Sequence, residues 1–285
     1  MPSAKQFLKK LSQKILPGHD PSFLIIGAQK AGTTSLHHHL DQHPKLAGSF
    51  PKEINYFSRH IHHGKDLDWY RKCFTSLTKP NALFFESTPN YMHSELVAKD
   101  IAAHYPNIKL IMILRDPVMR AFSGWNMYRS FSPKEVARKK AIKLKSAQSE
   151  NKVYKYFFEN RTEFPSFREI VELELSFIKK GSADGPYILR KGLYAEQIKA
   201  YYKHFDRSQI LIIGFKDLIN AQQDTCNQIL NFLKVDGPLF KDKIATKNKR
   251  EYTERMSDED RAFVQEFYDK PNQELVELLG KVLNW

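Results

Sequence analysis

The sequence predicts an α/β fold with a central, mainly parallel sheet covered by helices on both faces. The first observation is the alternation of strand-like apolar runs with helix-length amphipathic segments, which is typical of parallel sheets. The second is that residues 24–26 and 110–114 are apolar throughout, as strands buried on both faces are. The third is a glycine-containing loop after the first run. The strand-like runs are residues 23–27, 83–85, 109–114 and 209–213.

The loop after the first run has the glycine spacing of a phosphate-binding loop. Gly27 and Gly32 are spaced as in the P-loop motif G-x-x-x-x-G-K-[ST]. Thr33 occupies the place of the motif's lysine, and the nearest lysine, Lys30, comes earlier. A helix-like segment opens at Ser35, and a helix N-terminus favours an anion through its exposed N–H groups and its dipole. We therefore expect a P-loop-like, three-layer domain whose loop holds a phosphate without the usual equipment for a nucleoside triphosphate.

A second polar segment follows the run 109–114. Arg115 leaves this run, and Pro117 suits the first turn of a helix because its missing N–H is not needed there. Ser123 follows about two helical turns later. An arginine fork with a hydroxyl suits a terminal phosphate, although Arg115 could form a structural ion pair and Ser123 could be a surface hydroxyl. Since ligands bind at the carboxyl ends of parallel strands, the two segments together imply a ligand with two separate phosphate positions.

The rest of the chain is expected to form one large domain over residues 21–285, preceded by a basic amphipathic segment at residues 1–20. Residues 131–165 hold a lysine- and arginine-rich run followed by an aromatic patch, and we expect an insertion outside the sheet there.

Two later helices are predicted from their end signals. One covers residues 166–180 and ends before Gly181, a residue suited to the left-handed C′ position. Another begins at Ser257, with Asp260 in a place that resembles a capping box. We expect Pro271 to interrupt this helix, with a last helical piece after it.

The net charge and the number of cysteines indicate which partners and which cellular compartment to expect. The formal net charge of +13 favours anionic partners such as nucleotides, nucleic acid, acidic glycans or a membrane surface. Cys73 and Cys226 lie far apart in the sequence and predict no disulfide framework or metal pair. A reducing compartment is the simpler interpretation, so we expect a cytoplasmic protein.

The N-terminal segment carries apolar residues at helical spacing among lysines, over residues 5–16. It lacks the apolar core of a signal peptide, and no run in the chain approaches the roughly 18 residues of a membrane span. The segment could contact a membrane surface peripherally. The simpler interpretation, which we favour here, is a short helix that packs on the domain or frays.

Several motifs together resemble the sulfotransferases that use 3′-phosphoadenosine 5′-phosphosulfate (PAPS). Residues 29–35 are similar to the family's 5′-phosphosulfate loop, and residues 114–117 with Ser123 resemble its 3′-phosphate motif. Residues 51–57 resemble the segment with the catalytic glutamate in the heparan-sulfate branch, which includes N-deacetylase/N-sulfotransferases and 3-O-sulfotransferases. Further segments similar to this branch lie at residues 86–91, 192–194 and 209–218. The chain resembles a bacterial-type member of the family.

The resemblance implies a set of site residues. Glu53 would be the general base, and its simpler alternative is an exposed glutamate paired with Lys52. Lys30 would stabilise charge on the leaving phosphate, so that no metal is required. PAPS would be the co-substrate and 3′-phosphoadenosine 5′-phosphate (PAP) the product. The implied cofactor-binding residues are Lys30, Ala31, Gly32, Thr33, Thr34, Ser35, Arg115, Ser123, Lys247, Asn248, Lys249 and Arg250.

The acceptor is left open by the sequence. The candidates are a glycan, a lipid, an alcohol, a phenol or an amine, and the insertion at 131–165 could face it. Ser87 and Asn55 depart from residues common in the heparan-sulfate branch, and the disulfide loop of many relatives cannot form with these two cysteines. We expect these departures to change which acceptor is used and to leave PAPS binding intact.

Two other functions are weighed against a sulfotransferase. A P-loop kinase or other nucleotide phosphotransferase is disfavoured by Thr33 in the lysine position. A non-catalytic anion- or nucleic-acid-binding protein would fit the charge, but no nucleic-acid motif is present, so no nucleic-acid partner is expected. A metal site is not expected either. Three consecutive histidines, residues 37–39, would point about 100° apart on a helix, and residues 60–63 lack a placed carboxylate.

Overall fold

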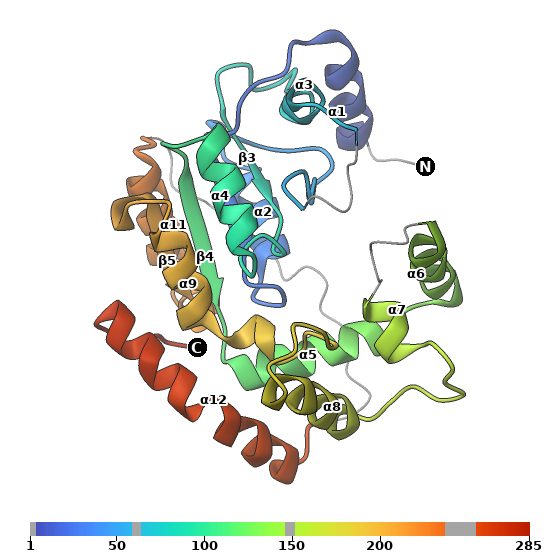
Figure 1. Cartoon of the computed structure of the whole chain (residues 1–285). Helices are drawn as coiled ribbons and strands as arrows, with labels where there is room; N and C mark the ends of the chain where they lie inside the picture. Colours follow the sequence, from blue (N-terminus) through green and yellow to red (C-terminus); the bar gives the residue numbers. More distant parts are fainter. Residues whose placement is uncertain (1–3, 59–63, 146–151, 237–254) are drawn as a thin grey trace. The chain divides into compact units, whose positions relative to one another are not determined.

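The computed structural model describes residues 4–58, 64–145, 152–236 and 255–285. These residues form two compact units. The first comprises the described residues within Met1–Arg115, Glu196–Lys249 and Lys281–Trp285, and the second comprises those within Asp116–Ala195 and Arg250–Gly280. Figure 1 traces the order of the helices and strands along the chain.

The first unit is built on a five-stranded sheet in which all neighbouring strands are parallel. The strand order is β2-β3-β1-β4-β5, so β1 lies in the middle and the chain continues to either side of it. Their carboxyl ends therefore share one edge, and in sheets of this kind ligands generally bind where the strand order changes direction. The strands are β1 (Phe23–Gly27), β2 (Leu46–Gly48), β3 (Leu83–Ser87), β4 (Lys109–Leu114) and β5 (Ile210–Gly214).

The predicted α/β class with flanking helices is confirmed. Residues of β1 are all buried, and in β4 only Lys109 is partly exposed, which agrees with their continuous apolar sequence. Strand β3 extends two residues beyond its apolar run, to Ser87, and carries Glu86 inward. Strand β2 was not predicted, because three residues with a glycine carry little strand signal.

Helices of the first unit pack on this sheet. Helix α2 contacts β1, β2 and β3, while α10 and α11 contact β5. Helix α4 begins after Ser94, whose side chain accepts a hydrogen bond from the Val97 N–H. The helices are α1 (Ala4–Ile15), α2 (Thr33–Leu40), α3 (Leu67–Arg71), α4 (Glu95–His104), α10 (Phe215–Asn220) and α11 (Gln222–Leu233). Helix α9 (Tyr194–Tyr202) belongs to the first unit from Glu196 onward.

The second unit is helical around an aromatic core. Its helices are α5 (Pro117–Arg129), α6 (Pro133–Lys145), α7 (Lys152–Phe157), α8 (Phe167–Lys179) and α12 (Asp258–Leu279). The predicted insertion contributes α6 and α7, and no part of it that the structure describes joins the sheet. The core includes Trp125, Tyr128, Phe157, Phe167 and Tyr268.

The sequence predicted where the two late helices, α8 and α12, begin, but it did not predict the full length of α12. Ser166 and Glu169 form a reciprocal capping box at the start of α8, and Gly181 follows its end with φ +65°. Helix α12 begins after Ser257, as expected. The predicted interruption at Pro271 is wrong, because α12 continues through this residue to Leu279. Proline removes one backbone hydrogen bond, and the helix is long enough to keep its remaining bonds and its buried residues.

Candidate active site

The phosphate loop lies between the carboxyl end of β1 and the N-terminus of α2. Helix α2 begins at Thr33, two residues earlier than the sequence indicated. Its N-cap is Gly32, which has φ +87° and supplies no side-chain cap. A Cβ added there would lie 3.2 Å from both Phe215 and Leu218. The glycine therefore serves two purposes: it permits a left-handed backbone, and it lets α10 pack closely behind the loop.

Arg115 lies beside this loop. Its guanidinium donates a hydrogen bond of 3.0 Å to the backbone oxygen of Lys30 and stands 4.8 Å from the ring centroid of Phe215. Lys30 itself has φ +74°, a left-handed conformation that costs free energy in a non-glycine residue and is common at functional sites. The structure thus brings together two of the segments expected to bind the cofactor, which are 85 residues apart in sequence.

The helix that carries Ser123 belongs to the second unit. Asp116 caps α5 by accepting hydrogen bonds from the N–H groups of Val118 (2.8 Å) and Met119 (3.1 Å), and Pro117 takes the first helical position as predicted. Ser123 is on α5 with only 2% of its surface exposed. The alternative interpretation of Ser123 as a surface hydroxyl is therefore wrong.

Glu53 lies in the loop between β2 and α3. Its side chain is 46% exposed, and Lys52 Nζ lies 2.9 Å from Glu53 Oε1. Lys52 also donates a 3.4 Å hydrogen bond to the carbonyl oxygen of Ser87, at the carboxyl end of β3. This ion pair is the simpler alternative considered from the sequence, and it leaves the carboxylate open to solvent.

A buried carboxylate holds the backbone that follows Glu53. Glu86 is fully buried and accepts hydrogen bonds of 3.0 Å from Tyr70 Oη and from Thr88 Oγ1. Thr88 Oγ1 in turn accepts the N–H of Asn55 (3.3 Å), and Tyr91 Oη accepts the N–H of Phe57 (3.3 Å). Burial raises the pKa of Glu86 to about 7, although hydrogen bonds from the side chains of Tyr91, Tyr70 and Thr88 and from the Ile54 N–H oppose the rise.

From the sequence, Glu86 was placed only in a segment that resembles the family, and its structural role was not predicted. Glu86 is fully buried, so its carboxyl cannot contact a substrate without rearrangement. One feature of the sequence could have indicated this role: a lone glutamate near the end of an apolar, aromatic strand. A carboxylate buried in such a strand needs hydrogen-bonding partners.

The histidines of α2 diverge, as the helical geometry predicted. His37 is buried, and its Nδ1 lies 2.9 Å from Ser87 Oγ, whereas His38 is exposed. Burial lowers the pKa of His37 well below its ordinary value, and the Lys52 charge adds to this effect. Among the residues that the structure describes, no three His, Cys, Asp or Glu side chains are grouped to hold a metal ion.

Some predicted residues lie outside the described ranges. These are the basic segment Lys247, Asn248, Lys249 and Arg250, and the histidines at 60, 62 and 63. None of the helices in the described part of the chain has both the length and the hydropathy needed to cross a membrane.

Comparison with known proteins gives the context for this site. A family model described as "Sulfotransferase domain" matches residues 20–270. The membrane-associated sulfotransferase kil1 of Dictyostelium discoideum is 24% identical, over 93% of this chain and 66% of the relative. The human bifunctional heparan sulfate N-deacetylase/N-sulfotransferase 1 is 28% identical, over 92% of this chain and 30% of the relative. The chain thus spans less than the full length of both relatives.

A solved structure agrees with these matches. The crystal structure of a sulfotransferase from Alicyclobacillus acidocaldarius has a TM-score of 0.67 and 25% sequence identity. The similarity covers 93% of this chain and 98% of that one.

Proposed function

This chain belongs to the sulfotransferase domain family, and we propose that Lys30, Arg115 and Glu53 carry its sulfuryl transfer from PAPS to a hydroxyl or amine. Enzymes of this family use PAPS as the donor. The observation that supports the proposal is the hydrogen bond from Arg115 to the Lys30 carbonyl, because it joins the segments expected to bind the two phosphate positions. The family match and Thr33 in the lysine position favour this function over a kinase or a non-catalytic anion binder.

The residues of the loop fit a nucleotide with two phosphate positions. The loop ends at the N-terminus of α2, where first-turn N–H groups have no acceptor within the helix. Lys30 and Arg115 are both partly buried cations, and residues 27–35 contain no acidic side chain. PAPS would supply the activated sulfuryl group, with its 5′ end at the loop and its 3′-phosphate at Arg115.

Lys30 would act on the leaving group. Negative charge grows on the departing phosphate oxygen during transfer, and a fixed cation stabilises that charge most in the transition state. The left-handed backbone of Lys30 and the bond from Arg115 to its carbonyl both restrict the conformation of this residue. The restriction would hold the ammonium group ready without a metal ion.

Glu53 would remove the proton of the acceptor. Its half-exposed carboxylate can be reached from solvent, and the Glu86 network fixes the backbone at Asn55 and Phe57. A general base needs such a fixed position because proton transfer requires hydrogen-bond contact. Lys52 would orient the carboxylate through its 2.9 Å contact.

We propose a glycan as the acceptor. The name of the human relative states that it acts on heparan sulfate. Near Glu53 in the sequence, Tyr56 stacks with Trp69 at a centroid distance of 6.5 Å, and both rings are only partly buried. A partly exposed aromatic face suits the apolar side of a sugar ring.

The test is the Glu53→Gln variant, assayed with labelled PAPS on partly de-N-acetylated heparosan, which offers both hydroxyls and free amines, and on a lipid alcohol, a phenol and a simple amine. Turnover should fall about 10²–10⁴-fold, as expected for loss of a general base, while PAP still raises the melting temperature. Glu95→Gln is the matched control. Glu95 is 50% exposed and pairs with Lys203 at 2.9 Å. It therefore resembles Glu53 in exposure and in its ion pair, and differs mainly in its position in the fold.

Two outcomes would count against parts of the proposal. Near wild-type turnover in Glu53→Gln, on whichever acceptor is sulfated, would remove Glu53 as the base. Sulfation of the lipid alcohol, phenol or amine but not of the glycan would overturn the acceptor class and leave the residue roles intact.

A further inference from the structure

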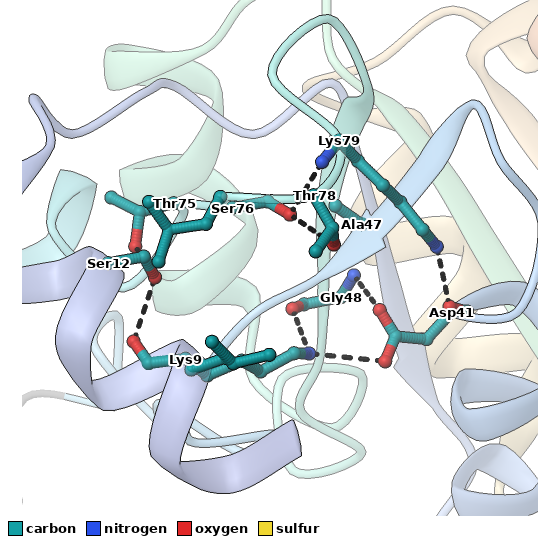
Figure 2. Close-up of a pocket in the computed structure, with 11 residues that line it drawn as sticks. Lys9, Ser12, Asp41, Ala47, Gly48, Thr75, Ser76, Thr78 and Lys79 are labelled. Carbon is teal, nitrogen blue, oxygen red and sulfur yellow. Dashed lines mark hydrogen bonds and ion pairs between the residues drawn. The ribbon is translucent and has the colours of Figure 1, made fainter. Parts of the chain in front are cut away.

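Helix α1 packs on the first unit through its polar side (Figure 2). Lys9 Nζ donates to the carbonyl oxygen of Gly48 at 2.7 Å and lies 3.2 Å from Asp41 Oδ2. Ser12 is fully buried, and its hydroxyl lies 2.9 Å from that of Thr75. An amphipathic helix on a globular domain normally buries its apolar stripe. In α1 this arrangement is reversed.

The apolar side of α1 is exposed. Phe7 and Ile15 are each 60% exposed, Leu8 is 41% exposed and Leu11 is 36% exposed. Positions 7, 11 and 15 are four residues apart, so these side chains form one stripe along the helix. Leu77, which is 39% exposed, lines the same small cavity as Leu8 and continues the apolar surface onto the domain. Single exposed apolar residues need no explanation, whereas an aligned group marks an interaction surface.

Lysines border this stripe. Lys10 and Lys14 are both exposed, and at 100° per residue they form a row next to Phe7 and Leu11. The whole chain carries a net charge of +13. A negatively charged partner would therefore meet complementary charge beside an apolar strip.

We propose that α1 docks this protein on the surface of an anionic lipid bilayer, with the side chains of Phe7, Leu8, Leu11 and Ile15 entering the headgroup boundary. An apolar stripe with lysines beside it is the pattern of helices that lie in the membrane interface. A stable protein partner would need an interface of roughly 800 Å² on each side, which five partly exposed side chains do not supply. The proposal is independent of the catalytic residues assigned above.

The test uses the full chain and vesicles of two compositions. The first is phosphatidylcholine alone, and the second is an equal mixture of phosphatidylcholine and phosphatidylserine. Flotation should recover the protein with the mixed vesicles only, and added salt should weaken binding because it screens the lysines. Sulfation of a soluble acceptor is measured in parallel and should not depend on the vesicles, so that failure of docking and failure of catalysis are distinguishable.

The double variant Phe7→Gln/Ile15→Gln should lose at least about tenfold in vesicle affinity, because the apolar contribution scales with buried area. Glutamine keeps the helix propensity, and circular dichroism checks the fold. Leu96→Gln is the control, because Leu96 on α4 is 64% exposed but outside the stripe. Lys10→Glu/Lys14→Glu should lose binding to the mixed vesicles while keeping the fold.

Three results would overturn the proposal. The first is equal recovery of wild type and the double variant, and the second is an equal loss in Leu96→Gln. The third is a dimer in gel filtration that the double variant abolishes without any wild-type vesicle binding, which would make the stripe an interface between two copies of the chain.

Discussion

The guanidinium of Arg115 and the backbone carbonyl of Lys30 are joined by a hydrogen bond of 3.0 Å. One residue follows β4 and the other lies in the loop after β1, the neighbouring strand. Parallel pairing brings their carboxyl ends to one edge of the sheet. The bond therefore couples the loop expected to hold the sulfated phosphate to the arginine expected to hold the other one.

Arg115→Ala should remove the preference of the protein for PAP over adenosine 5′-phosphate. The guanidinium is the predicted partner of the 3′-phosphate, which only PAP carries. In the wild type, PAP at about 100 times its dissociation constant should stabilise the fold by about 2.7 kcal/mol, and a thermal-shift titration measures this effect. If ATP stabilises the wild type as well as PAP does, the cofactor assignment fails.

The bond from Arg115 to Lys30 could also affect the loop itself, so a second variant separates the two effects. Arg115→Lys keeps the charge but loses the planar fork. It should retain part of the PAP preference if charge dominates, and should behave like Arg115→Ala if the fork geometry dominates.

Lys30→Ala should slow turnover more than it weakens PAP binding. The ammonium meets charge that is largest in the transition state, so kcat should fall about 10²–10³-fold, as for the loss of one such donor. Steady-state kinetics with PAPS and a PAP titration measure the two quantities separately. Lys99→Ala, an exposed lysine on α4, is the control. A change in the KM for PAPS alone would make Lys30 a positioning residue.

Gly32→Ala should destabilise the protein by about 1–2 kcal/mol. The residue has φ +87°, where a side chain is strained, and the new Cβ would lie 3.2 Å from Phe215 and Leu218. Urea denaturation measures the change in the free energy of unfolding. Gly64→Ala, at φ +82° with no atom of the described residues within 4 Å of the added Cβ, measures the cost of the backbone strain without that of the close contact. Equal losses in the two variants would mean that close packing of α10 adds nothing.

Glu86 should make the stability of the protein fall as pH rises. Its pKa is about 7 in the folded protein against 4.5 for the ordinary side chain. The folded state therefore binds more protons than the unfolded state between these values. The stabilising contribution is complete below about pH 4.5 and is lost as pH rises to about 7, with a total of up to about 3 kcal/mol.

Glu86→Gln provides the comparison, because glutamine resembles the protonated carboxyl and does not titrate. The free energy of unfolding is measured by urea at pH 5 and pH 8 in both proteins. Wild type should lose more stability than the variant over this interval. A pH dependence that is identical in the two proteins would show that the carboxyl of Glu86 titrates normally.

Local sequence patterns predicted much of the fold and part of the site. Strands β1 and β4 were identifiable because a strand buried on both faces must be apolar throughout. The start of α12 at Ser257 was identifiable because capping depends on residues only three positions apart, and the Ser257 side chain does accept a hydrogen bond from the Asp260 N–H. A local pattern also led to the wrong prediction at Pro271. This residue type usually ends a helix, but α12 continues through it in the folded protein.

The sequence by itself determined the parallel α/β class, the glycine-containing loop between β1 and α2, and the presence of Arg115 at the end of β4. Only the tertiary structure decided that Arg115 contacts the Lys30 carbonyl, that Glu86 is a buried support for the segment after Glu53, and that α1 packs through Lys9 and Ser12. Periodicity shows that a helix has two sides, but not which side meets the domain. That choice depends on partners distant in the sequence, here Asp41, Gly48 and Thr75, whose position is set by the folded sheet and its loops.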